Sequence, residues 1–265
     1  MEYTRNKGIF LIDTLQAKGK RTFTIEEAQQ VLKLARPNIR ILLSNLKRQK
    51  RILALTRGLY ALWHPSERRW GIRPLPILDD LMKFKKTPYY IGLLSAADYY
   101  GAAHQKPQRL QVVVPRQFHM RNLADLVISI HVRMGFSDQG LEQVTTESGF
   151  VFYSSAELTA LDLLYLQSAS GGFGNVCMVI KELLTKLDPK KLRQIAEQYP
   201  VTASLQRLGY LLQHFQGNIT LVDNLRQIIK KRKPGPVALS PAYPKKGSLD
   251  EVWRIIANAD VEIEP

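Results

Sequence analysis

Apolar residues between residues 24 and 48 recur at helical spacing in two consecutive stretches. Thr24 and Glu27 stand three residues apart in the sequence TIEE, which is the spacing of a capping box at the start of a helix. The apolar residues of this first stretch share one helix face: Ile25, Ala28, Val31 and Leu32. The pattern stops near Arg36 and Pro37, where proline cannot continue one helix but can open the next. We therefore predict two helices joined by a turn at about residues 34–37.

The second predicted helix has an apolar face and a basic face. Its apolar stripe consists of Ile39, Leu42, Leu43 and Leu46, at the spacing of a helix that packs against a core. Four polar or cationic residues fall together on the opposite face: Arg40, Ser44, Lys47 and Arg48. A recognition helix turns such a face to a DNA groove.

Two short apolar runs follow this helix and predict a pair of strands. They are Ile52–Leu55 and Leu59–Leu62, and they flank Arg57 and Gly58. Glycine supplies the positive φ of a tight hairpin turn, which places Arg57 at the tip. Two helices and a hairpin are typical of a winged helix-turn-helix, and an arginine on the wing can reach a minor groove or a phosphate.

Positive charge is concentrated in the same part of the chain. The 265 residues carry a net charge of +15, and residues 1–73 hold 16 of the 38 Lys and Arg but only 5 of the 23 Asp and Glu. A small module with most of the excess positive charge favours a phosphate-binding function. The alternative is a structural module whose basic face is simply solvated, because charged runs are usually solvated surfaces.

Proline, glycine and charged residues crowd residues 63–76 (WHPSERRWGIRPLP) and mark a connector. We predict a winged helix-turn-helix domain at residues 1–74 and a larger mixed α+β domain at residues 75–265, so the fold class is α+β. Helices are expected in the second domain at 75–83, from Thr87 onward, and at 158–167, 175–187, 190–199, 201–215 and 219–231. Strands are expected at 110–114, 126–132, 143–146, 150–153 and 251–263, with Ser148 and Gly149 in a hairpin turn.

The cysteine, the histidines and the hydropathy of the chain limit which other classes of protein it can belong to. A single cysteine, Cys177, excludes an intrachain disulfide and a cysteine-based zinc cluster. No apolar run approaches the roughly 18 residues of a membrane span, so we expect a cytoplasmic protein. The histidines show no ligand spacing, and no metal or cofactor is expected: His64, His104, His119, His131 and His214.

Three stretches resemble enzyme motifs, and none of them is convincing. Gly19-Lys20 lacks the following Ser or Thr of a phosphate-binding loop, and the Gly171–Gly174 stretch is better explained as a break between helices. Asp188-Pro189-Lys190 with Asp162 upstream has a spacing found in some nucleases, but a helix start accounts better for Asp188. We expect no catalytic residues, and a metal-dependent nuclease is kept as a remote alternative.

The whole chain resembles a known family, the AbiEi antitoxins of bacterial abortive-infection, type IV toxin–antitoxin systems. Five segments carry the resemblance in order: NIRILLSNLKRQKRI with TRGLYAL, YYIGLLSAADYYGAAHQKPQRLQVVVP, SSAELTALDLLY, QRLGYLLQ and WRIIANADVE. The resemblance implies an N-terminal winged helix and a C-terminal antitoxin domain. It also implies repression of the protein's own promoter through inverted repeats, and phage defence through neutralisation of a nucleotidyltransferase-like toxin without a stable complex.

The predicted DNA-binding residues lie on the second helix, directly after it and on the wing. Arg40 and Asn38 are the candidates for base contacts, because guanidinium pairs with guanine edges and carboxamide with adenine edges. The full predicted set is Arg36, Asn38, Arg40, Ser44, Lys47, Arg48, Lys50, Arg51 and Arg57. Lys47, Arg48, Lys50 and Arg51 are expected to hold phosphates.

Two questions stay open at the level of the sequence. The first is whether residues 75–265 instead bind a toxin or another partner directly, with only non-specific DNA binding by the first domain. Surface candidates for such a partner are Arg207, Lys230, Lys231 and Arg232, although a basic run more often marks a solvated helix end. The second is whether two copies form a homodimer in solution or meet only on an inverted repeat.

Overall fold

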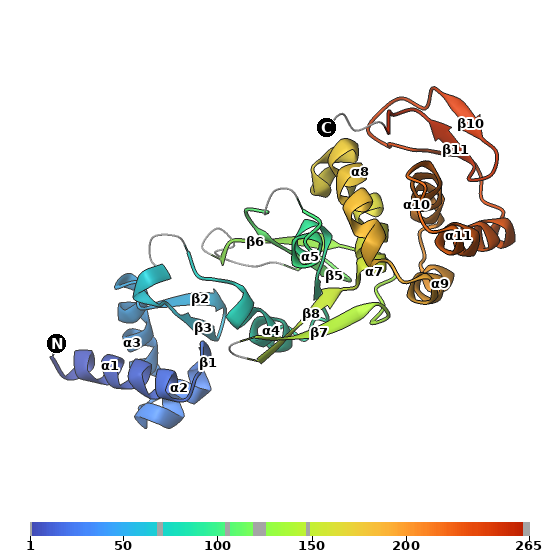
Figure 1. The fold of residues 1–265 in the computed structure, drawn as a ribbon. Coiled ribbons are helices and arrows are strands. Elements are labelled where there is room, and N and C mark those ends of the chain that lie inside the picture. The colour runs from blue at the N-terminus through green and yellow to red at the C-terminus, as the bar shows by residue number, and fades with distance from the viewer. Residues whose placement is uncertain (1, 68–70, 104–106, 119–125, 147–148, 262–265) are drawn as a thin grey trace. The chain divides into compact units, whose positions relative to one another are not determined.

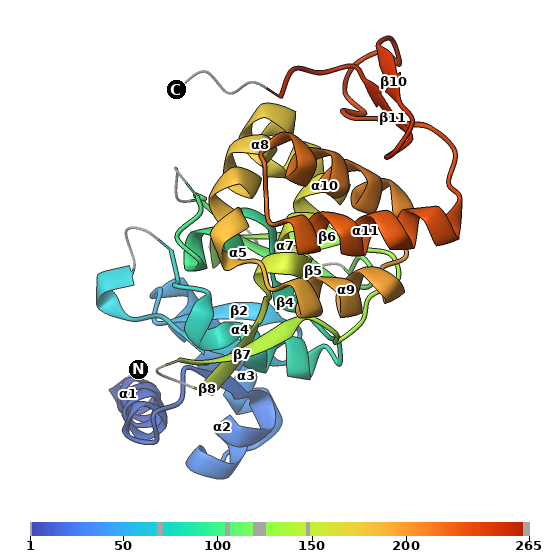
Figure 2. The ribbon, with the colours of Figure 1, turned by 45° about the vertical axis from the view of Figure 1, so that its right-hand side comes forward.

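A computed structural model of the chain describes residues 2–67, 71–103, 107–118, 126–146 and 149–261. The chain forms two compact units, each built from helices and strands (Figures 1 and 2). Unit 1 comprises Met1–Tyr89, Val114–His131 and Gln143–Val151, and unit 2 comprises Tyr90–Val113, Val132–Glu142 and Phe152–Pro265. The predicted α+β class is confirmed. Because the two units are interleaved along the sequence, the predicted domain boundary near residue 74 stays a prediction.

Unit 1 begins with a three-helix module and a small antiparallel sheet. Its elements are α1 (Glu2–Ala17), β1 (Thr22–Thr24), α2 (Ile25–Leu32), α3 (Arg36–Arg48), β2 (Ile52–Thr56) and β3 (Leu59–Leu62). The sheet order is β1-β3-β2, with β3 antiparallel to both neighbours. This is the element order of a winged helix-turn-helix, and we call the β2–β3 hairpin the wing. The predicted helices and hairpin lie where expected, whereas α1 and β1 were not anticipated.

Local sequence fixes the ends of α2 and α3. The Thr24 hydroxyl accepts a hydrogen bond from the Glu27 backbone N–H at 3.2 Å, and the Glu27 carboxylate accepts one from the Thr24 N–H at 2.8 Å, so the predicted capping box is present. Lys33 ends α2 in the left-handed conformation. Pro37 lies in the first turn of α3, where its missing N–H removes no helical hydrogen bond.

A single core holds the module together. Leu11 and Leu15 of α1, Phe23 of β1 and the apolar stripe of α3 are all buried in it. Gly8 allows α1 to approach α3, because a Cβ at this position would lie 3.1 Å from Leu46 Cδ2. The buried stripe therefore fixes which face of α3 remains exposed.

Helix α4 (Leu75–Phe84) follows a short 3-10 turn, η1 (Pro65–Glu67), and matches the predicted helix at residues 75–83. Ile77, Leu78, Leu81 and Met82 form its buried face. The Thr22 hydroxyl donates a hydrogen bond of 2.5 Å to the Asp80 carboxylate. This bond ties α4 to β1.

Five strands form a mixed sheet of order β6-β5-β4-β8-β7. They are β4 (Tyr90–Ile91), β5 (Leu110–Val114), β6 (Ile128–Val132), β7 (Leu141–Thr146) and β8 (Gly149–Ser154). Strand β4 is antiparallel to β5 and parallel to β8. Predicted strands 110–114, 143–146 and 150–153 are confirmed. Ser148, predicted for the hairpin turn, lies outside the described residues.

Two predictions in this region are wrong in part. The helix expected from Thr87 is limited to α5 (Leu93–Tyr99), because Tyr90 and Ile91 pair with β5 instead. Gly92 lies between this strand and the helix. A Cβ at residue 92 would lie only 2.9 Å from Val113 Cγ2, so the position favours glycine. The strand expected from residue 126 begins only at Ile128, because Val127 has a φ of 50° and cannot continue an extended strand.

The rest of unit 2 is mainly helical. Helices α7 (Ala156–Tyr165), α8 (Gly172–Leu183), α9 (Pro189–Gln198), α10 (Thr202–His214) and α11 (Ile219–Arg232) confirm the predicted series, with 3-10 turns η2 (Gln167–Ser170) and η3 (Leu184–Lys186) between them. Residues 156–164 of α7 are all buried. Helices α5, α8, α9 and α10 pack against α7, which is therefore the centre of this core (Figure 2).

The C-terminal segment forms the third sheet of the chain, which has three strands in the order β10-β11-β9. Its strands are β9 (Val237–Ala238), β10 (Ser248–Asp250) and β11 (Ile255–Ala257). The single terminal strand predicted at 251–263 is wrong, because residues 251–254 form a turn that buries Trp253 and the strand covers only Ile255–Ala257. Residues 262 and 263 lie outside the described part of the chain.

Candidate nucleic-acid interface

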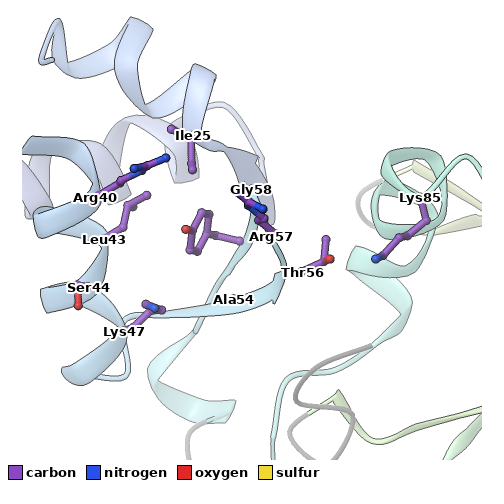
Figure 3. A pocket seen from close by; sticks show the side chains of 11 residues that line it. Ile25, Arg40, Leu43, Ser44, Lys47, Ala54, Thr56, Arg57, Gly58 and Lys85 are labelled. Atoms are coloured by element: carbon purple, nitrogen blue, oxygen red, sulfur yellow. The ribbon is translucent and has the colours of Figure 1, made fainter. Parts of the chain in front are cut away.

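Helix α3 and the wing border one groove of unit 1 (Figure 3). The groove has a volume of about 820 Å³ and is lined by Ile25, Arg40, Leu43, Ser44, Lys47, Ala54, Thr56, Arg57, Gly58, Tyr60 and Lys85. Four of the predicted DNA-binding residues are among them. Arg40, Ser44 and Lys47 come from the exposed face of α3, and Arg57 comes from the tip of the wing.

No described carboxylate pairs with the cations of this groove. Within the described residues, Arg40, Lys47 and Arg57 make no ion pair and no side-chain hydrogen bond. An arginine or lysine without a protein partner keeps all its N–H donors for a ligand. The groove can therefore bind anionic groups without first breaking interactions within the protein.

Tyr60 of strand β3 also lines the groove. Its ring stacks on Phe23 with centroids 5.5 Å apart, and Tyr60 pairs with Ala54 across the wing. Burial raises the pKa of Tyr60, while the positive charge of Arg40 acts in the opposite direction. The phenol is therefore neutral at physiological pH, and its O–H can donate a hydrogen bond to a bound anion.

The other predicted residues lie on α3 or directly after it but do not line the groove. Asn38 is exposed in the first turn of α3. Arg36 forms an ion pair of 3.2 Å with Glu26, and Arg48 donates a hydrogen bond of 2.6 Å to Asn45. Lys50 and Arg51 lie in the turn between α3 and β2, where Lys50 has a φ of 51°. The structure thus brings Arg40, Ser44, Lys47 and Arg57 together and leaves the other five outside the groove.

Three polar groove residues were not in the predicted set: Thr56, Tyr60 and Lys85. The alternation of β3 carried a signal for Tyr60, because Leu59 and Ala61 are buried and the residue between them must face the other side of the sheet. Lys85 carried no such signal. It directly follows the last residue of α4, and only the tertiary structure brings it to the wing (Figure 3).

Two surface candidates of unit 2 prove to stabilise the fold. Arg232 donates hydrogen bonds of 2.9–3.0 Å to the backbone oxygens of Ala196, Glu197 and Tyr199 and to the Thr202 hydroxyl. Arg207 donates one of 3.0 Å to the Ala238 carbonyl. Arg232 thereby satisfies carbonyls at the end of α9, which have no partner within the helix. Lys230 and Lys231 are exposed.

The carboxylates considered for a nuclease have other partners. Asp188 accepts hydrogen bonds from the backbone N–H groups of Lys190 and Lys191, so it caps α9. Asp162 is fully buried, accepts hydrogen bonds from Tyr90 (2.6 Å) and Tyr199 (2.8 Å), and lies 3.7 Å from Arg133 Nε. Burial raises the pKa of Asp162 against the opposing effects of Arg133 and both hydroxyls.

Neither a metal-binding cluster nor a membrane-spanning helix occurs in the described part of the chain. Among its residues, no three His, Cys, Asp or Glu side chains group in a way that could hold a metal ion. His104 and His119 lie outside this part. The described helices include none that is both long and apolar enough to cross a membrane.

Part of the chain matches a known domain family in sequence, and its fold resembles that of a solved structure. Residues 90–214 match the family model of the AbiEi antitoxin C-terminal domain. None of the curated proteins matches. The crystal structure of the RV2827C protein from Mycobacterium tuberculosis has a similar fold, with a TM-score of 0.70 and 14% sequence identity over 94% of this chain and 90% of that chain. The resemblance drawn from the sequence is thus confirmed over residues 90–214, which match the AbiEi antitoxin C-terminal domain of toxin–antitoxin systems.

Proposed function

We propose that the protein is a DNA-binding autorepressor and antitoxin, and that the groove between α3 and the wing binds duplex DNA. The observation that carries the proposal is the set of cations in that groove, Arg40, Lys47 and Arg57, which have no carboxylate partner among the described residues. Phosphate contacts supply most of the affinity for DNA, and unpaired Lys and Arg side chains provide them.

Within this proposal, α3 enters the major groove and the wing contacts the flanking backbone or minor groove. Arg40 contacts a guanine edge, because its guanidinium can donate two parallel hydrogen bonds to O6 and N7. Lys47, Arg57 and the hydroxyls of Ser44 and Tyr60 hold phosphates. The residues outside the groove, Arg36, Asn38, Arg48, Lys50 and Arg51, make secondary contacts at its ends.

The operator is an inverted repeat in the promoter of the protein's own operon, occupied by two copies of the chain in the cytoplasm. This part of the proposal rests on the match of residues 90–214 to the AbiEi antitoxin C-terminal domain. The antitoxin domain counteracts a nucleotidyltransferase-like toxin encoded beside it, and the protein itself catalyses no reaction. Together the two activities would make the protein a component of phage defence.

Fluorescence anisotropy on the upstream DNA and on a scrambled duplex tests the DNA-binding part. The native sequence should bind at least about a thousandfold more tightly at physiological salt. Arg40→Ala should cost about 1–3 kcal/mol on the native site and reduce its advantage over the scrambled duplex.

Arg36→Ala is the matched control for this experiment. It also removes one arginine from α3, but Arg36 lies outside the groove and pairs with Glu26. Its effect should be clearly smaller than that of Arg40→Ala. Equal affinity of the wild-type protein for both duplexes would reject sequence-specific repression.

A further inference from the structure

The end of α4 lies against the wing, although α4 follows the predicted winged helix in the sequence. A Cβ at Gly58 in the wing turn would lie 3.5 Å from Phe84 Cζ, which is an ordinary van der Waals contact. The hydrogen bond from Thr22 to Asp80 and the buried face of α4 hold the helix in this place. The wing is therefore bordered by α3 on one side and by the last turn of α4 on another (Figure 3).

Three lysines lie at this helix end, and they differ in their surroundings. Lys83 forms an ion pair of 2.6 Å with Asp79 and lines another depression, together with Lys18, Lys20 and Thr22. Lys86 adopts a φ of 50° just after the helix and lines neither of these two hollows. Lys85 lines the groove of α3 and the wing, and it has no carboxylate partner among the described residues.

The position of Lys85 needs more than the helix dipole to explain it. Cations are favourable near any helix C-terminus, and Lys83 and Lys86 meet that preference without lining the groove. Lys85 is instead partly buried, and its side chain points toward Thr56 on the wing from the side opposite α3 (Figure 3). Its Nζ lies 6.0 Å from the centroid of the Phe118 ring, so part of its surroundings is apolar.

We infer that Lys85 binds a DNA backbone phosphate beside the wing, so that the DNA-binding surface of unit 1 extends beyond the winged helix to α4. The inference rests on the proposed function and adds a third element to its interface. Arg57 lies at the tip of the wing, and Lys85 points toward Thr56 from the end of α4, so one cation lies on the wing and a second lies beside it. DNA that receives the wing would meet phosphate-binding groups from α3, from the wing and from α4.

Lys85→Gln tests this contact, because it removes the charge and keeps most of the side-chain stem. Binding to the upstream duplex and to a scrambled duplex is measured by anisotropy from low to physiological salt. Loss of one phosphate contact should reduce the slope of log K against log salt by about 0.9. It should weaken binding to both duplexes by the same factor, since a phosphate contact does not depend on sequence.

Lys83→Gln is the matched control, because it removes the same charge from the same helix end but outside the groove. It should leave the salt slope at the wild-type value. If Lys85→Gln also keeps the wild-type slope while Arg40→Ala weakens specific binding, the inference fails and the proposed function stands. If the wild-type protein binds neither duplex, both are overturned.

Discussion

Trp253 packs the six-membered ring of its indole directly against Gly209 of α10. A Cβ at residue 209 would lie 2.0 Å from Cζ3 of this ring and 2.4 Å from Cε3. Trp253 is completely buried, and its Nε1 donates a hydrogen bond of 3.0 Å to Gln213, one turn further along α10. The absence of a side chain at residue 209 therefore allows the C-terminal sheet to be anchored on the helical core of unit 2.

Gly209→Ala should destabilise unit 2 by about 1–3 kcal/mol, because the added methyl group overpacks this contact and displaces the indole. Urea denaturation followed by tryptophan fluorescence measures the change. Gly174→Ala is the control, since Gly174 lies in α8 and a Cβ there would have nothing within 4 Å. That replacement should be neutral or stabilise by up to about 1 kcal/mol through helix propensity. Equal effects of the two substitutions would contradict the close contact.

Short-range patterns were sufficient to predict the elements around the groove. The capping box of α2, the proline in the first turn of α3 and the glycine of the wing act within a few residues, so the sequence displays them directly. The apolar stripe of α3 determines which face is exposed, so the sequence alone identifies Arg40, Ser44 and Lys47 as residues of that face. Such signals are local and independent of the rest of the fold.

Long-range contacts account for what the sequence did not predict. Helix α1 has a polar start, and its buried Leu11 and Leu15 become recognisable only when α3 is packed against them. The terminal strand was predicted too long because burial of Trp253 against Gly209 imposes a turn that alternation cannot show. Lys85 reaches the groove through the packing of α4 against the sheet, across 28 residues of sequence from Arg57.

The buried carboxylate of Glu67 forms ion pairs with Arg21, just before β1, and with Arg73, just before α4. Both of its carboxylate oxygens lie 2.8 Å from Arg21 Nη2, and Oε1 lies 3.2 Å from Arg73 Nε. Burial by itself would raise the pKa of Glu67, but the charges and hydrogen bonds of Arg21 and Arg73 outweigh it and lower the pKa below 4.5. Stabilisation by a carboxylate with a lowered pKa is present above the unfolded-state value and is lost as the pH falls through the folded-state value.

Glu67→Gln should therefore destabilise unit 1 by about 1.5–3 kcal/mol at pH 7, because both arginines lose a charged acceptor. The difference from the wild-type protein should shrink as the pH falls below about 4.5, where the unfolded chain takes up the proton. Urea midpoints at a series of pH values between about 7 and 2 measure it. A difference that stays constant across this range would show that the negative charge of Glu67 contributes nothing to stability.

Gly58 determines the geometry of the wing. Its substitution tests the contribution of wing geometry to DNA binding without changing the charge of the wing. Its φ of +94° is a conformation that residues with a side chain rarely adopt, and its carbonyl accepts a hydrogen bond of 3.3 Å from the Ile25 N–H. Gly58→Ala should cost about 1–3 kcal/mol of stability through backbone strain. It should also weaken binding to the upstream duplex several-fold by displacing Arg57, with little change in the salt slope because no charge is removed.

Gly19→Ala provides the comparison, because Gly19 also has a positive φ, +68°, with open space around it and a position outside the groove. Both variants should lose stability, whereas only Gly58→Ala should lose affinity in the anisotropy titration. Strain at residue 19 alters the turn between α1 and β1, while strain at residue 58 alters the element that carries Arg57. If Gly58→Ala is destabilised to the expected extent but binds DNA like the wild-type protein, the wing does not take part in the interface and Arg57 is only a solvated surface residue.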